Sequence, residues 1–92
     1  MSRFEKLIER LLNNPKDFSF SDLERILKSF RYIEQKTGKT SGSRVAFVNT
    51  VTKHIIRLHK PHPKPILRNY QIKYIIEELK KEGYINEKYN II

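Results

Sequence analysis

Apolar side chains recur every three or four residues in three stretches of the chain, which is the spacing of one face of an α-helix. The stretches carry these apolar residues: Phe4, Leu7, Ile8, Leu11 and Leu12; Leu23, Ile26, Leu27 and Phe30; and Ile72, Ile75, Ile76 and Leu79. The pattern predicts a helix at 3–12, a second that begins near residue 20, and a third near the C-terminal end.

Residues that favour helix ends flank these stretches. Ser2 and Ser21 are the expected N-caps of the first two helices, and each has a glutamate three residues later that completes a capping box. Asn69 is the expected N-cap of the last helix. Gly83 suits the position just after the end of that helix, because glycine adopts a positive φ without steric strain.

The apolar period changes to two between the second and third helices. Segments 32–36, 44–48 and 54–59 alternate or are rich in β-branched residues, and they predict three strands. Strict alternation puts His54, Ile56 and Leu58 on one face of the last strand, and Ile55, Arg57 and His59 on the other. Short connections between the strands favour an antiparallel meander.

A small sheet with one open face needs helices on its other face, so this order of elements predicts an α+β fold. It resembles the double-stranded-RNA-binding fold, α-β-β-β-α, with an antiparallel three-stranded sheet, helices on one face and an extra N-terminal helix. The length of 92 residues predicts a single domain, 1–92, in which 2–14 form the additional helix. A fold alone does not assign a function.

Composition narrows the class of protein. The chain has no cysteine, which excludes disulfides and thiolate chemistry and fits a reducing cytoplasm. Its apolar runs are too short for a transmembrane helix, and acidic residues interrupt the N-terminal region where a signal peptide would lie. We therefore expect a cytoplasmic protein that neither spans a membrane nor binds one.

The net charge of +9 belongs to one part of the chain. No Asp or Glu lies between Glu34 and Glu77, and we call residues 35–76 the acid-free segment. Its basic residues are Lys36, Lys39, Arg44, Lys53, Arg57, Lys60, Lys64, Arg68 and Lys73. The rest of the chain has equal numbers of basic and acidic residues. A segment without acids presents a positive field to a polyanion such as RNA, although a basic surface without a ligand is the simpler alternative.

Three parts of the acid-free segment carry candidate chemistry. The loop at 38–44 offers backbone amides and hydroxyls for phosphate oxygens, or it is a plain hairpin loop. Residues 68–73 open a helix, where an anion is favoured, or they simply cap it. The expected RNA-binding residues are Lys39, Ser41, Ser43, Lys60, Lys64, Arg68 and Lys73.

The third part holds two histidines three residues apart among prolines and lysines. His59 and His62 suit general acid–base catalysis on a phosphodiester, because imidazole exchanges protons near neutral pH. His59 as a strand-end residue bonded to backbone is the alternative. A metal site with His54 as a third ligand is disfavoured, because no Cys, Asp or Glu lies nearby and the surrounding cations repel a dication. No metal and no cofactor are expected.

The order of these motifs resembles a known family. The runs are GKTSGSRVAF, HIIRLHKPHP and ILRNYQIKYIIEELKKEG, and together they cover about residues 21–85. They look like the HicA toxins of bacterial toxin–antitoxin pairs. The resemblance implies a small ribonuclease that cleaves mRNA, has the double-stranded-RNA-binding fold and is neutralised by a HicB-like antitoxin.

One position departs from the family pattern. HicA toxins have a catalytic histidine in a Gly-Ser-His sequence, whereas this chain has Arg44 after Gly42 and Ser43. Arginine stays protonated and cannot act as a general base. Either His59 or His62 transfers the proton while Arg44 stabilises the charged phosphate, or the chain is a non-catalytic RNA-binding module. A third possibility is a protein-interaction domain whose basic face meets an acidic partner.

Overall fold

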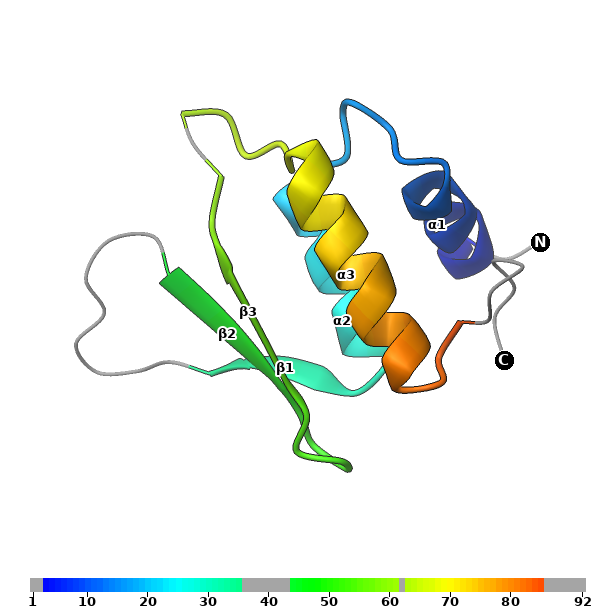
Figure 1. Cartoon of the computed structure of the whole chain (residues 1–92), viewed down its shortest axis with the longest axis vertical. Helices are drawn as coiled ribbons and strands as arrows, with labels where there is room; N and C mark the ends of the chain where they lie inside the picture. Colours follow the sequence, from blue (N-terminus) through cyan, green and yellow to red (C-terminus); the bar gives the residue numbers. More distant parts are fainter. Residues whose placement is uncertain (1–2, 36–43, 62, 86–92) are drawn as a thin grey trace.

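The computed structural model describes residues 3–35, 44–61 and 63–85 (Figure 1). The elements follow the predicted order, and their bounds are α1 (Arg3–Leu12), α2 (Phe20–Ser29), β1 (Tyr32–Gln35), β2 (Arg44–Asn49), β3 (Ile55–His59) and α3 (Asn69–Lys81). The fold is α+β and is compatible with the α-β-β-β-α arrangement plus an extra N-terminal helix. The predicted fold class is therefore confirmed.

The three strands form an antiparallel meander in the order β1-β2-β3. All three helices lie on one side of this sheet (Figure 1). Side chains on the helix side are buried, as at Tyr32, Phe47 and Ile56. The opposite side is open, since Ile33 on β1 is 52% exposed and Arg57 on β3 is exposed as well. Alternation in the sequence therefore predicted the two faces of β3 correctly.

A single cluster of buried apolar residues joins the sheet to the helices. It includes Phe18, Leu23, Leu27, Ile72 and Leu79, none of which is exposed. Helix α1 adds Ile8 and Leu11 to this cluster and lies beyond α2 and α3 from the sheet (Figure 1). Burial of a large apolar side chain stabilises a fold by roughly 1.5–3 kcal/mol, so α1 contributes to the core rather than hanging from it.

Two predicted N-caps were each wrong. Helix α2 is capped by Ser19, whose hydroxyl accepts a hydrogen bond from the Asp22 backbone N–H at 3.1 Å, whereas Ser21 lies inside the helix. Helix α3 is capped by Arg68 rather than Asn69. The Gln71 side chain explains this shift, because its Oε1 accepts from the Arg68 backbone N–H at 3.0 Å. Ser2 lies outside the described residues.

The C-terminal end of α3 follows the prediction. Gly83 has a φ of +80°, and its N–H donates to the Lys80 carbonyl. The N–H of Tyr84 then donates to the Leu79 carbonyl, which completes a Schellman motif. The chain turns back here, so that Ile85 is buried and the ring of Tyr84 stacks on Phe30 with centroids 4.6 Å apart.

The connector between β3 and α3 is held by backbone hydrogen bonds to the segment before α2. Phe20 N–H donates to the Pro65 carbonyl at 2.9 Å, and Leu67 N–H donates to the Phe18 carbonyl at 2.8 Å. These bonds form a short antiparallel bridge that includes Ser19 and Ile66. As a result, the N-terminal ends of α2 and α3 lie at the same end of the molecule as the last residues of β3 (Figure 1).

The length and hydropathy of the described helices bear on whether they could span a membrane. None of them is long and apolar enough to cross a lipid bilayer.

Candidate functional site

Arg44 and His59 are direct cross-strand partners. Arg44 begins β2, His59 ends β3, and the antiparallel register pairs the two residues. Directly opposed residues point to the same face, with Cβ atoms about 4.5–5.5 Å apart. Both side chains are exposed on the open face of the sheet. The register therefore brings two of the three predicted catalytic residues together although fifteen positions separate them in the sequence.

A hydrogen bond holds the backbone at His59 in place, whereas the side chain of His59 is exposed. The His59 carbonyl accepts a hydrogen bond from Gln71 Nε2 at 2.8 Å, and Gln71 is only 4% exposed. This contact anchors the end of β3 to the first turn of α3. The imidazole has no hydrogen bond to another described residue. A fixed backbone with an exposed ring is suitable for proton transfer to a bound substrate.

Further exposed cations lie on β3, on the connector after it and at the start of α3. Arg57 lies on the same face of β3, two residues from His59. The predicted RNA-binding residues Lys60, Lys64, Arg68 and Lys73 are exposed along the connector and the start of α3. Lys60 Nζ lies over the ring of Phe20, 5.5 Å from its centroid, which holds this cation at the N-terminal end of α2.

The ion pairs of the described residues leave these cations unpaired. They involve Asp17, Asp22, Glu77, Glu78 and Glu82, all of them outside the acid-free segment. Of the basic side chains within that segment, His54 alone shares an ion pair with a described carboxylate. The cations at the end of β3, along the connector and at the start of α3 therefore remain available to an anion.

Four predicted site residues cannot be compared with the structure. His62, Lys39, Ser41 and Ser43 lie outside the described residues. Their roles remain predictions. Arg57 was not among the predicted RNA-binding residues, although the alternation of β3 already put it on the face of His59.

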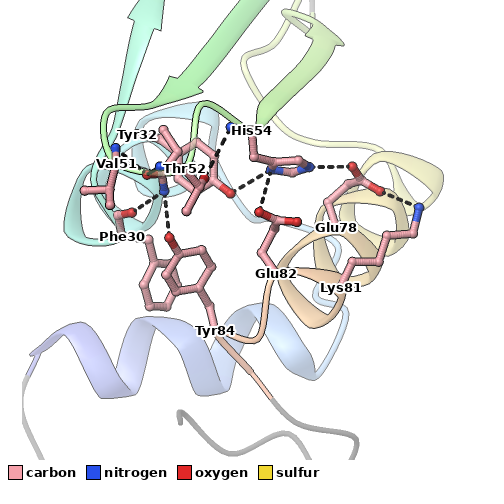
Figure 2. A network of polar contacts seen from close by, with 10 residues as sticks. Phe30, Tyr32, Val51, Thr52, His54, Glu78, Lys81, Glu82 and Tyr84 are labelled. Carbon is pink, nitrogen blue, oxygen red and sulfur yellow. Dashed lines mark hydrogen bonds and ion pairs between the residues drawn. The ribbon is translucent and has the colours of Figure 1, made fainter.

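His54, unlike His59, lies in a network of polar contacts inside the fold, which Figure 2 shows. Its Nδ1 lies 2.8 Å from the Tyr32 hydroxyl, and its Nε2 lies 3.0 Å from a Glu78 carboxylate oxygen. The neutral ring satisfies both contacts when Tyr32 O–H donates to Nδ1 and Nε2–H donates to Glu78. The ring therefore links β1, the start of β3 and the end of α3.

Tyr32 and Glu78 have shifted pKa values in this network. Burial, followed by the nearby Tyr84 and Glu82, raises the pKa of Tyr32 well above its ordinary value, so its hydroxyl stays protonated. Burial also acts to raise the pKa of Glu78. The hydrogen bonds from Lys81 and His54 outweigh that effect, so the pKa of Glu78 is lowered and the carboxylate stays ionised.

Asn49 fixes the turn that leads to His54. Its Nδ2 donates to the Phe30 carbonyl at 2.9 Å and to the Tyr84 hydroxyl at 2.7 Å. Its Oδ1 accepts from the N–H groups of Val51 and Thr52. Asn49 is fully buried, and every polar atom of its amide group is used. The His54 network is thus an extension of a structural hydrogen-bond system within the fold (Figure 2).

The described segments also bear on the metal alternative. They bring no three His, Cys, Asp or Glu side chains into a group that could hold a metal ion. Both ring nitrogens of His54, the third ligand in that alternative, instead contact Tyr32 and Glu78. The sequence signal for this structural role was the position of His54 on the same strand face as Ile56 and Leu58.

Comparison with known proteins identifies no relative of this chain: no family model, curated protein or solved structure matches it.

Proposed function

We propose that this chain is an RNA-binding toxin that cleaves mRNA in the cytoplasm without a metal ion and is held inactive by a HicB-like antitoxin. The observation that carries the proposal is that Arg44 and His59 lie directly opposite each other on β2 and β3. Both side chains are exposed, and neither forms an ion pair with a described residue. Cleavage of a phosphodiester bond needs proton transfer, which an imidazole supplies, and stabilisation of the charged phosphate, which a permanent cation supplies.

The proposed reaction uses the ribose 2′-hydroxyl as the nucleophile. His59 accepts its proton as the oxygen attacks the adjacent phosphorus, and Arg44 stabilises the extra negative charge on the phosphate oxygens. The bond from phosphorus to the 5′-oxygen breaks, and the leaving oxygen takes a proton from a general acid. His62, the other histidine that the sequence nominates for acid–base chemistry, takes that role in this proposal. The products are a 2′,3′-cyclic phosphate and a free 5′-hydroxyl.

The surrounding cations support RNA as the substrate. Lys60, directly after His59 in the chain, is exposed, as are Lys64, Arg68 and Lys73 on the connector and at the start of α3. Contacts of this kind to phosphates supply affinity without sequence preference, and they weaken as salt displaces them. An antitoxin with an acidic surface would cover the same end and block access to it.

The decisive experiment is cleavage of labelled RNA in excess EDTA by the purified chain. We expect cleavage to persist, and we expect His59→Ala to reduce its rate by about 10²–10⁴-fold, the contribution of a general base. Arg44→Ala should reduce the rate by about 10²–10³-fold through loss of charge stabilisation. Lys53→Ala, in the exposed turn before β3, is the matched control and should cleave like the wild type.

Circular dichroism would establish that each variant keeps the fold. Full activity of His59→Ala would refute its assignment as the base. Loss of cleavage in EDTA that Mg²⁺ restores would refute the metal-independent mechanism.

Arg44 itself favours a second candidate function. It stands where the HicA toxins that the sequence resembles have a histidine, and it cannot accept a proton. RNA binding that weakens steeply with salt but yields no product would indicate a non-catalytic RNA-binding module. A chain that fails to bind RNA even at low salt would instead fit an interaction domain for an acidic protein.

A further inference from the structure

A small groove lies along the free edge of the sheet, between β3 and α3. It has a volume of about 220 Å³ and is lined by Arg57, Leu58 and His59 of β3 and by Tyr70, Gln71 and Tyr74 of α3. The groove therefore shares His59 with the Arg44–His59 pair. Ligand pockets for drug-sized molecules measure roughly 300–1,000 Å³, so this groove accommodates a single planar ring system rather than a larger ligand.

Its walls are already held in position by hydrogen bonds. The Tyr74 hydroxyl accepts the Arg57 backbone N–H at 3.3 Å, and Gln71 Nε2 donates to the His59 carbonyl at 2.8 Å. These contacts satisfy backbone groups on the outer edge of β3 that would otherwise face water. The groove is formed by the packing of α3 against this edge and does not need a ligand to create it.

Tyr70 is an exposed aromatic residue on the wall of the groove. Its side chain is 65% exposed, and it makes no hydrogen bond to another described residue. Tyr74, one turn later, is 36% exposed. Lys73 lies on the same exposed surface of α3, because residues three and four apart are neighbours on a helix. Exposed aromatic rings interleaved with cations are the pattern of surfaces that stack nucleobases while contacting phosphates.

We propose that the groove between β3 and α3 binds one unpaired nucleobase of single-stranded RNA, stacked on Tyr70 and Tyr74, and so positions the adjacent phosphate beside His59. This inference rests on the proposed function and names its substrate class. Duplex RNA does not fit the inference, because its bases are stacked and paired within the helix and cannot enter a groove of this size.

The test separates stacking of bases from attraction of phosphates. Binding is measured by fluorescence anisotropy with three labelled probes of equal phosphate number: a single-stranded oligoribonucleotide, the same backbone without bases, and a duplex. We expect the single strand to bind more tightly than either of the other two. Quenching of tyrosine fluorescence, in a chain that has no tryptophan, provides an independent readout of stacking.

Substitution of Tyr70 makes the test specific to the groove. Tyr70→Ala should weaken binding of the single strand by about 5- to 150-fold, which is the range for loss of one base–aromatic stack. The same variant should leave binding of the backbone without bases unchanged. Tyr70→Phe keeps the ring and should bind like the wild type. Val51→Ala, at a residue 72% exposed in the turn before β3, is the control for loss of an exposed apolar side chain.

The outcomes distinguish this inference from the function on which it rests. No binding of any probe at low salt would refute RNA binding itself. Equal binding of the oligonucleotides with and without bases, or an unaffected Tyr70→Ala variant, would refute the nucleobase groove and leave RNA binding intact. A duplex bound as tightly as the single strand would also overturn the assignment. Thermal unfolding of each variant, followed by circular dichroism, controls for loss of the fold.

Discussion

At the scale of single residues, the two described histidines differ in their surroundings. His54 and His59 lie five residues apart in the chain, yet their rings lie on opposite faces of the sheet. His54 contacts Tyr32 and Glu78 through both nitrogens. The ring of His59 remains exposed beside Arg44. The sequence nominated His59 and not His54 for acid–base chemistry, and in the structure the ring of His59 is exposed whereas that of His54 is held within the fold.

The Glu78 carboxylate predicts a specific dependence of stability on pH. Its pKa in the folded protein is lowered from 4.5, with Lys81 and His54 outweighing burial. A depressed acid pKa stabilises the fold at pH values above about 4.5, and this contribution is lost as pH falls through the folded value. Glu78→Gln should therefore lower the free energy of unfolding near pH 7 and flatten its decline below pH 4.5. Urea denaturation at a series of pH values measures this.

A neighbouring carboxylate supplies the control for that experiment. Glu77 lies on the same turn of α3, but its side chain is 67% exposed and only 3.9 Å from Lys80 in a surface ion pair. Exposed pairs contribute little to stability. Glu77→Gln should follow the wild-type pH profile. Parallel curves for Glu78→Gln and the wild type would contradict the role given to Glu78.

At the scale of elements, local signals located the helices and strands well and their ends less well. Both misplaced N-caps have the same cause. Ser19 and Arg68 occupy the cap positions because contacts to Asp22 and Gln71 satisfy the first backbone groups of each helix. Several polar residues near each helix start could cap it, and which one does depends on the angle at which the chain enters the helix.

The C-terminal cap of α3 was predictable because only one residue there tolerates the required backbone. Gly83 has a φ of +80°, and a Cβ built at this position meets no atom within 4 Å. Gly83→Ala should therefore destabilise the fold through backbone strain alone, by about 1 kcal/mol. Gly83→Asn should be less destabilising, because asparagine adopts positive φ more readily. Chemical denaturation provides both values, and an unchanged Gly83→Ala variant would contradict the Schellman motif.

At the scale of the whole molecule, acidic residues are absent from the start of α3 and present toward its end. Arg68 and Lys73 lie at the start, whereas Glu77, Glu78 and Glu82 lie toward the end together with Lys80 and Lys81. The strand register and the bridge between Ser19 and Ile66 bring further cations to the first of these ends. Several basic residues of the acid-free segment thus lie at the end of β3, along the connector and at the start of α3.

This localisation predicts how RNA binding responds to salt. For single-stranded nucleic acid, the plot of log affinity against log salt has a negative slope, which becomes shallower by roughly 0.7 for each phosphate contact removed. The double variant Lys64→Gln/Arg68→Gln should therefore bind more weakly and have a slope shallower by up to about 1.4. Titrations at several salt concentrations measure it.

Lys6→Gln/Lys28→Gln is the matched control for that comparison. It removes the same net charge from exposed positions on α1 and α2, outside the acid-free segment. Its slope should remain close to that of the wild type. Equal losses in the two double variants would indicate that total charge, rather than the cationic end, determines binding.

The sequence by itself determined the order of elements, the faces of the strands and the segregation of charge, because periodicity and composition are local properties. It also nominated Arg44 together with His59 or His62, without showing where they lie relative to one another. Only the tertiary structure decided that these two residues oppose each other, that His54 lies in a polar network and that Tyr70 borders a groove. Those relations depend on strand register and helix packing between residues far apart in the chain, which no local pattern encodes.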